Sequence, residues 1–380
     1  MATISLCMIV RDEEEVLEKC LAQVKDLADE IIIVDTGSKD RTKEIAARIA
    51  DRVEDFVWQD DFAAARNAAF ALARCDFCMW LDADDVITEK ERKKFLKVKE
   101  SLDLDIDVVV MDYAAGFGPD GRPNFIYPRE RLIRNGRGYR WEGRVHETIA
   151  IQGRVLRSSV VIEHRKKKVN DPDRNLRIYE AMAARGEEMD ARSRLYYGRE
   201  LYQHRRYEEA EALLISVLRD REAWKEYRIE ASLNAACCAS FLGKPEEALE
   251  LLFASFSADL PRAEICCEAG RIWMEKGDYS SAAYWFEEAL RSPEPREEGG
   301  FVREECRGYI PWLQLCVCWD RLGEYERAQW CNEKAGEIYP ESPQVEYNRE
   351  YFRGIMPIQE ASQEPVFLEK YARKDSESVL

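Results

Sequence analysis

Three aspartates within four residues, Asp82, Asp84 and Asp85, directly follow an apolar run at residues 77–81. The run predicts a buried β-strand, so the three carboxylates stand where that strand ends. Carboxylate oxygens suit Mg²⁺ or Mn²⁺, which usually share their coordination with phosphate oxygens. The pattern therefore indicates a site for a divalent cation and a phosphorylated ligand, although an ordinary acidic turn after a strand would have the same composition.

Further side chains could complete such a site. His164 ends an apolar segment at residues 160–164 and offers an imidazole ligand that would favour Mn²⁺, although a lone histidine is as often an ordinary core or surface residue. His146 and Glu147 follow a tryptophan and a glycine, and either could take a proton from an attacking acceptor. Transfer from a nucleotide-activated donor needs such a base and a cation that stabilises the leaving diphosphate.

The first half of the chain alternates strand and helix patterns. Apolar runs predict strands at residues 3–10, 30–35, 53–57, 77–82 and 105–113, and a period near 3.6 predicts helices at 13–27, 41–50, 61–74 and 88–100. This order predicts an α/β fold with a mostly parallel sheet, followed at 121–163 by an antiparallel extension. Since ligands bind beyond the carboxyl ends of parallel strands, we expect the polar residues that follow these strands to converge.

Arg66 and Asn67 lie one turn into the predicted alanine-rich helix at residues 61–74, after Asp60 and Asp61. Either aspartate could cap that helix, which would make the whole segment structural. The alternative is that Arg66 faces a nucleotide phosphate. The residue chemistry alone favours the capped helix.

Four segments in order, at residues 5–14, 31–42, 61–67 and 80–85, resemble the successive motifs of family 2 glycosyltransferases of the GT-A fold. The resemblance implies a Rossmann-like sheet and inverting transfer from a nucleotide-sugar, often a UDP-sugar. It implies that Asp35 contacts the nucleobase or ribose, that Asp84 binds the metal, and that His164 completes the metal site. It also implies that the pair His146 and Glu147 provides the base and acceptor contacts. Asp12 departs from the pattern, because many members have asparagine there.

On this basis we assign Mn²⁺ or Mg²⁺ to Asp84 and His164, and the base to Glu147 or His146. The donor is expected to contact residues at the strand ends and on the alanine-rich helix, namely Val10, Arg11, Glu13, Asp35, Arg66, Asp82 and Ala83.

The second half of the chain resembles tetratricopeptide repeats. Helix–turn–helix units recur around turns at residues 204–210, 243–248, 277–282 and 323–328, and Ala248 and Ala282 lie 34 residues apart. Gly270 and Phe286 fall where the helices of the third unit should interlock. The predicted domains are therefore an α/β domain at 1–168, an all-α repeat solenoid at 169–354 with a loop inserted at 292–300, and a charged tail at 355–380.

The composition narrows the class of protein. A net charge of −17 argues against non-specific binding of nucleic acid, and no run is long enough to span a membrane. The N-terminus lacks the basic region of a signal peptide, so the 12 cysteines are expected to be reduced core residues of a cytoplasmic protein.

The fusion of the two domains resembles bacterial peptide glycosyltransferases that modify bacteriocin precursors. We therefore expect metal-dependent, inverting transfer from a UDP-sugar to a Ser, Thr or Cys side chain of a peptide or protein that binds to the repeats. One alternative is transfer to a glycan or a lipid-linked acceptor, and another is a repeat scaffold with an inactive nucleotide-sugar domain. The sugar, the linkage atom and the oligomeric state stay open, with a homodimer through the repeats as one option.

Overall fold

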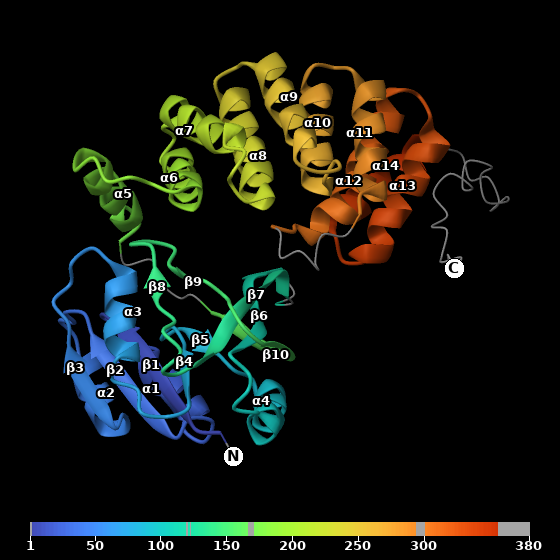
Figure 1. Ribbon diagram of the computed structural model, residues 1–380. Helices are drawn as coiled ribbons and strands as arrows, with labels where there is room; N and C mark the ends of the chain where they lie inside the picture. The colour runs from blue at the N-terminus through green and yellow to red at the C-terminus, as the bar shows by residue number, and fades with distance from the viewer. Residues whose placement is uncertain (1, 119–120, 122, 166–170, 294–300, 356–380) are drawn as a thin grey trace, which may run out of the picture.

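The computed structural model describes residues 2–118, 121, 123–165, 171–293 and 301–355, and shows an α/β domain under an arch of helices (Figure 1). The predicted tail lies outside the described residues except for residue 355. Most of the predicted loop insertion (294–300) and of the segment around the domain boundary (166–170) also lie outside them.

An eight-stranded sheet with the order β3-β2-β1-β4-β7-β6-β10-β5 forms the α/β domain. Its strands are β1 (Ile4–Val10), β2 (Glu30–Asp35), β3 (Arg52–Asp55), β4 (Phe77–Trp80), β5 (Asp85–Val86), β6 (Val108–Phe117), β7 (Pro123–Arg134) and β10 (Val155–His164). Strands β7 and β5 pair antiparallel with their neighbours, and the other pairs are parallel. The predicted mostly parallel sheet with an antiparallel extension is confirmed.

Helices cover this sheet because its apolar strands carry buried side chains on both faces. The helices are α1 (Leu17–Val24), α2 (Thr42–Ile49), α3 (Phe62–Phe70) and α4 (Glu89–Ser101). The predicted cap of α3 is confirmed, because the Asp61 carboxylate accepts a hydrogen bond from the backbone N–H of Ala64 at 2.8 Å. A small hairpin of β8 (Trp141–Glu142) and β9 (Thr148–Ile149) lies beside α3, where the Asn67 side chain forms two hydrogen bonds with the backbone of Trp141 (Figure 1).

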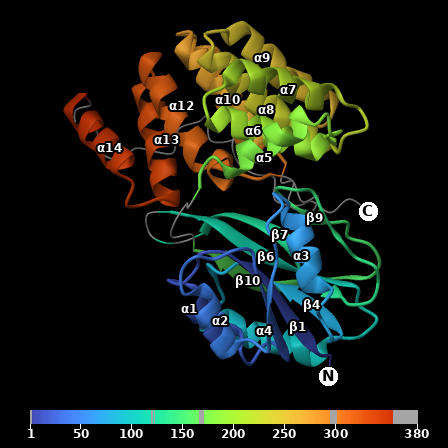
Figure 2. The ribbon, with the colours of Figure 1, turned by 90° about the vertical axis from the view of Figure 1, so that its left-hand side faces the viewer.

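The repeat domain begins with α5 (Arg174–Ala184) and continues as antiparallel helix pairs that stack side by side (Figure 2). The pairs are α6 (Ala191–Gln203) with α7 (Tyr207–Arg219), α8 (Lys225–Phe241) with α9 (Pro245–Ala254), α10 (Ala263–Glu275) with α11 (Tyr279–Arg291), and α12 (Tyr309–Arg321) with α13 (Tyr325–Ile338), followed by α14 (Pro343–Ile355). The turns within these pairs fall where the sequence predicts them. A short 3-10 turn, η3 (Glu304–Arg307), precedes α12.

Gly270 allows α10 and α11 to pack closely. A Cβ at this position would lie 2.8 Å from ring atoms of Phe286, which is closer than carbon atoms pack. We expect Gly270→Ala to lower the free energy of unfolding by about 1–3 kcal/mol, because the ring must leave its position. Urea unfolding measures this loss. Gly354→Ala in α14 is the control, since that Cβ meets nothing within 4 Å; equal stabilities of the two variants would contradict the packing argument.

Two expectations from the composition can be compared with the structure. All of the cysteines lie in the described residues, none of them is in a disulfide, and most are buried, as expected for reduced core residues. None of the helices in the described part of the chain has the length and apolarity that crossing a bilayer requires.

Candidate active site

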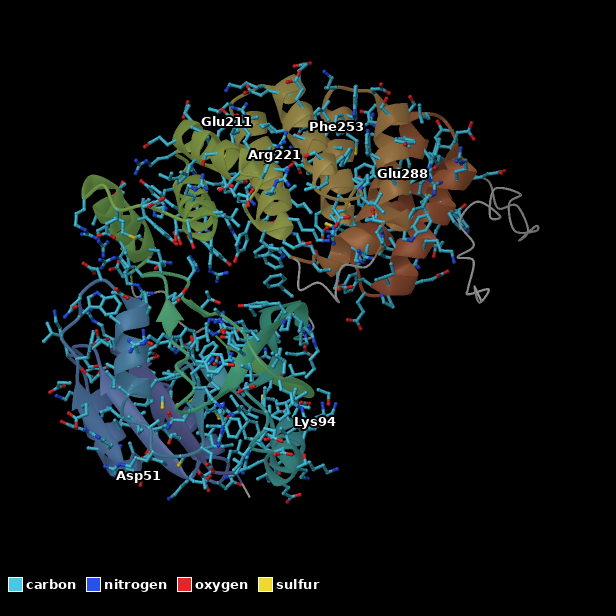
Figure 3. All side chains as sticks on the ribbon, in the orientation of Figure 1. Asp51, Lys94, Glu211, Arg221, Phe253 and Glu288 are labelled. Carbon is cyan, nitrogen blue, oxygen red and sulfur yellow. The ribbon has the colours of Figure 1, made fainter. Side chains whose placement is uncertain are left out.

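The predicted site residues gather at the carboxyl edge of the sheet. Strands β1, β2, β4 and β10 run in the same direction, so the residues that follow Val10, Asp35 and Trp80 reach the same edge as His164. Figure 3 marks the opposite edge with Asp51, which precedes β3 on the side of the domain away from the repeats. The site edge therefore faces the repeat domain.

Arg66 of α3 joins two of the predicted acids. Its Nη2 donates to Asp82 Oδ1 at 2.8 Å, and its Nε donates to Glu147 Oε1 at 2.5 Å. The guanidinium is buried and lies over the rings of Trp80 and Trp141, at 4.8 Å and 5.0 Å from their centroids. Burial opposes ionisation of Asp82, but the charge of Arg66 outweighs it and lowers the pKa of Asp82 to about 2.

Asp85, whose side chain is fully buried, is the centre of a second network. Its carboxylate accepts hydrogen bonds from Tyr113 Oη at 2.8 Å and from Arg131 Nη1 at 3.1 Å, and His164 Nδ1 lies 3.4 Å away. Arg131 also stacks on the ring of Trp80, 3.8 Å from its centroid. Since a buried charge must be paired, this network fixes Asp85 and, through it, the ring of His164.

A metal ion fits beside His164. Ligand atoms of Asp82, Asp85 and His164 lie within 4.8 Å of one another, and Asp84 Oδ1 lies 3.3 Å from His164 Nδ1. Two carboxylates and an imidazole suit Mn²⁺. Because both oxygens of Asp85 already have partners, Asp84 is the carboxylate that is more available to a metal. Burial disfavours the imidazolium, but the hydrogen bonds that it donates to the carboxylates of Asp84 and Asp85 outweigh this effect and raise the pKa of His164 to about 10.

Asp35 offers a free oxygen at the end of β2. Its Oδ1 accepts hydrogen bonds from the backbone N–H groups of Gly37 and Ser38 at 2.9 and 2.8 Å, whereas its buried Oδ2 has no partner among the described residues. Gly37 has a φ of +103°, which glycine adopts more easily than other residues, and this turn lets both N–H groups point at Asp35. A ligand that donates a hydrogen bond would satisfy Oδ2.

The loop after β1 is tied to the loop after β2. Asp12 has a φ of +55°, and its backbone N–H donates to Ser38 Oγ at 3.0 Å. Asparagine and aspartate tolerate this left-handed conformation, which explains how aspartate can stand where many family members have asparagine. Glu13 is held by a 2.7 Å bond from its N–H to Thr42 Oγ1, and burial together with the charges of Asp84 and Asp82 raises the pKa of Glu13 to about 7. Arg11 is exposed at the rim.

The structure separates the two candidate bases. Glu147 joins the cluster with Arg66, whereas the ring of His146 stacks on Tyr196 of α6 with centroids 4.1 Å apart. His146 Nε2 also lies 3.4 Å from Glu200 Oε1. The side chain of His146 therefore faces the repeats and not the cluster of acids.

Sequence reasoning missed the partners of Asp85. Arg131 is fully buried beside Leu132 and Ile133 near the end of β7, at a bulge where the pairing with β6 shifts register. An arginine next to an apolar strand segment is a signal for a buried ion pair, but nothing in the sequence identifies its partner 46 residues away.

Known proteins resemble parts of this chain. Residues 5–165 match the family model "Glycosyl transferase family 2". A TPR repeat-containing protein of Synechococcus elongatus is 41% identical over 153 residues, which is 39% of this chain and 36% of that protein. The SPbeta prophage-derived glycosyltransferase SunS of Bacillus subtilis is 31% identical over 148 residues, which is 38% of this chain and 34% of SunS.

The chain thus matches only about a third of the length of these curated relatives. Among solved structures, a glucosyl-3-phosphoglycerate synthase of Mycobacterium tuberculosis is similar with 21% identity and a TM-score of 0.26, over 30% of this chain and 44% of that chain. The residues that match the family model, 5–165, extend from β1 to β10 and include every strand end at the site edge. Residues 5–165 therefore form a glycosyl transferase family 2 domain, which tetratricopeptide-like repeats follow in the same chain.

Proposed function

We propose that this chain transfers a sugar from a UDP-sugar to a side chain of a peptide or protein, with inversion at the anomeric carbon. The observation that carries the proposal is the cluster of Arg66, Asp82, Asp84, Glu147 and His164 at the carboxyl edge of a family 2 domain. The cluster joins acids that suit a cation to a carboxylate that can accept a proton.

The donor is proposed to bind across the strand ends. Asp35 uses its unpartnered Oδ2 for the nucleoside, and Val10, Arg11 and Glu13 line the loop next to it. Asp82, Ala83 and Nη1 of Arg66, which has no partner in the part of the chain that the structure describes, are proposed to contact the sugar diphosphate. Asp84 and His164 would hold Mn²⁺ or Mg²⁺, which neutralises charge on the departing diphosphate when bound.

The transfer itself is a single displacement. The acceptor oxygen or sulfur forms a bond to the anomeric carbon while the bond from that carbon to the phosphate oxygen breaks. The electron pair of the broken bond leaves with UDP, and the proton of the acceptor passes to the Glu147 carboxylate. Arg66, which is itself bonded to Asp82, donates to the Glu147 carboxylate and orients it.

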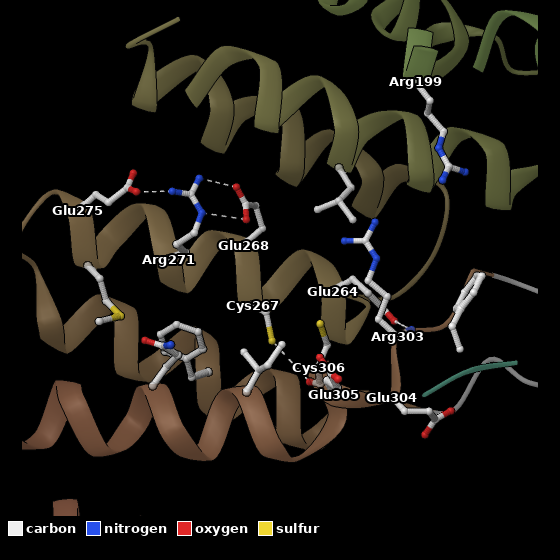
Figure 4. A pocket seen from close by; sticks show the side chains of 16 residues that line it. Arg199, Glu264, Cys267, Glu268, Arg271, Glu275, Arg303, Glu304, Glu305 and Cys306 are labelled. Atoms are coloured by element: carbon white, nitrogen blue, oxygen red, sulfur yellow. Dashed lines mark hydrogen bonds and ion pairs between the residues drawn. The ribbon is translucent and has the colours of Figure 1, made fainter. Parts of the chain in front are cut away.

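A groove supports a polypeptide acceptor. A cavity of about 680 Å³ lies between Phe125 of β7, Arg199 of α6, the turn η3 and the helices α8, α10, α11 and α12. Figure 4 shows its charged side chains, among them Glu268 and Arg271, and an apolar floor that includes Phe286 also lines it. Mixed charged and apolar walls suit a peptide segment better than an acyl chain, so a lipid-linked or glycan acceptor is the second candidate and an inactive scaffold the third.

The chemistry can be tested by metal removal. With UDP-glucose, UDP-N-acetylglucosamine or UDP-galactose, we expect UDP release that EDTA abolishes and Mn²⁺ restores, because the leaving diphosphate needs charge neutralisation. Asp84→Ala should lower this release at least about 100-fold, on the scale of one lost electrostatic group. Asp105→Ala is the matched control, since Asp105 is exposed and precedes β6, at the opposite edge of the sheet.

Different results would contradict the transferase activity and the metal assignment. Absence of UDP release with every donor would contradict the transferase, and equal rates of Asp84→Ala and Asp105→Ala would contradict the metal assignment. Mass spectrometry of candidate peptides then tests the acceptor. A hexose mass added to a glycan, with none added to any peptide, would favour the second candidate. A cytoplasmic location and a homodimer stay predictions.

A further inference from the structure

The loop from Arg144 to Glu147 lies between the two domains. The side chains of its first three residues contact the repeats, and the side chain of Glu147 contacts the α/β domain. Arg144 forms an ion pair with Glu187, 3.1 Å between Nε and Oε2, in the connection between α5 and α6. Val145 is buried in a cluster with Ile178 and other side chains of α5. Glu147 turns back to Arg66. The repeats therefore hold the residues just before Glu147, while Glu147 itself belongs to the site.

Arg192, in the first turn of α6, forms hydrogen bonds with the backbone of this loop. Its Nε and Nη2 both donate to the carbonyl oxygen of His146, at 3.2 and 3.0 Å, and its Nη1 donates to Tyr227 Oη at 2.7 Å. That carbonyl belongs to the peptide bond that joins His146 to Glu147. A forked guanidinium with each of these nitrogens bonded fixes both the place and the tilt of that peptide.

The conformation that Arg192 supports is a strained one. His146 has a φ of +53°, a left-handed conformation that is uncommon for residues other than glycine, although histidine adopts it more often than most. Such a residue costs of the order of 1–3 kcal/mol and persists only when its surroundings determine it. Here the surroundings are Tyr196 and Glu200, which hold the ring, and Arg192, which holds the carbonyl. All three come from α6.

We propose that Arg192 is a positioning residue for the transfer, through which the repeat domain completes the active site by holding Glu147 in place. This inference rests on the proposed function, in which Glu147 accepts the proton. Without Arg192, the His146 peptide can relax toward negative φ and carry Glu147 away from Arg66. A displacement of about 1 Å of a catalytic group can cost a factor of about 100 in rate.

The experiment compares two arginines of the same helix. Arg192→Ala removes the contact with the loop, whereas Arg194→Ala removes a contact within the repeats, since Arg194 Nη1 donates to Ser216 Oγ of α7 at 3.1 Å. For Arg192→Ala we expect kcat to fall by about 10–100-fold with the KM for the UDP-sugar unchanged. Arg194→Ala should keep both values, and Arg192→Lys, which retains one donor, should lie between.

Two further measurements separate positioning from general damage. In a Glu147→Gln background, Arg192→Ala should add little further loss, because the group that it positions is already gone. Amide hydrogen exchange should become faster at residues 144–149 and stay unchanged at residues 77–86. Equal kcat values for Arg192→Ala and Arg194→Ala, or unchanged exchange at 144–149, would overturn the inference. If the unaltered protein releases no UDP, the proposed function fails, and hydrogen exchange alone still decides whether Arg192 holds the loop.

Discussion

Replacement of Glu147 by glutamine is expected to lower kcat by a factor of about 100 to 10,000 for a hydroxyl acceptor, the range typical of a lost general base. Glutamine has nearly the same shape and can still accept the hydrogen bond from Arg66 Nε, so the loop should keep its place. What it loses is the ability to take a proton. Steady-state rates of sugar transfer, measured with the donor in excess, test this expectation.

The matched control for this change is Glu142→Gln, because Glu142 is exposed in β8, five positions earlier on the same segment. It should leave kcat unchanged. A thiol acceptor should show a much smaller effect of Glu147→Gln, since a thiol is already partly ionised near neutral pH. If Glu147→Gln and Glu142→Gln retain equal rates toward a hydroxyl acceptor, Glu147 is not the base.

Replacement of Arg131 by methionine is expected to lower the free energy of unfolding by about 3–5 kcal/mol, because it removes the fully buried counter-charge of the Asp85 carboxylate. Both side chains are fully buried, with Nη1 and Oδ2 3.1 Å apart. Chemical denaturation monitored by tryptophan fluorescence measures the loss, since Arg131 stacks on Trp80.

Arg134→Met on the same strand is the control, because Arg134 pairs with Asp76 at 3.4 Å where solvent reaches the pair. It should cost about 1 kcal/mol or less. The double change Arg131→Met with Asp85→Leu should recover most of the stability, because no buried charge is left without its partner. Its affinity for Mn²⁺ should be lower than that of the unaltered protein, because His164 has lost its neighbour Asp85. A double variant as unstable as Arg131→Met alone would show that packing, and not the buried charge, causes the loss.

The sequence predicts most of the fold because its signals are local. Continuous apolar runs such as Ile31–Val34 identify buried strands, and the turn residues of the repeats recur in register with their helices. The position of β7 between β4 and β6 is not local, since it depends on the return of the chain across the sheet. The prediction therefore included an antiparallel extension but not its place in the strand order.

The residues of the candidate site also divide into those that local sequence signals predict and those that depend on distant parts of the chain. Asp82, Asp84 and His164 could be found because each stands at the end of an apolar strand. Arg66 was harder, because an alanine-rich helix with a capping aspartate accounts for the segment without any ligand. The separation of His146 from Glu147 could not be predicted, because it depends on Tyr196 and Glu200, which lie some fifty residues further along the chain.

The contacts of α6 with the Glu147 loop determine where this chain can be divided into modules. A chimaera joined after residue 165 would separate Arg192 and Glu200 from the loop that they hold. A junction in the turn between α6 and α7 would keep them together, but it would also exchange Tyr227 of α8, so the incoming repeats must supply another acceptor for Arg192 Nη1. Leu214 of α7 packs so closely on Gly198 of α6 that a Cβ at Gly198 would lie 2.7 Å from it. The incoming α7 would therefore need a side chain at the position of Leu214 that packs against a glycine. The transferable unit is thus the α/β domain together with α5 and α6, the first two helices of the repeat domain.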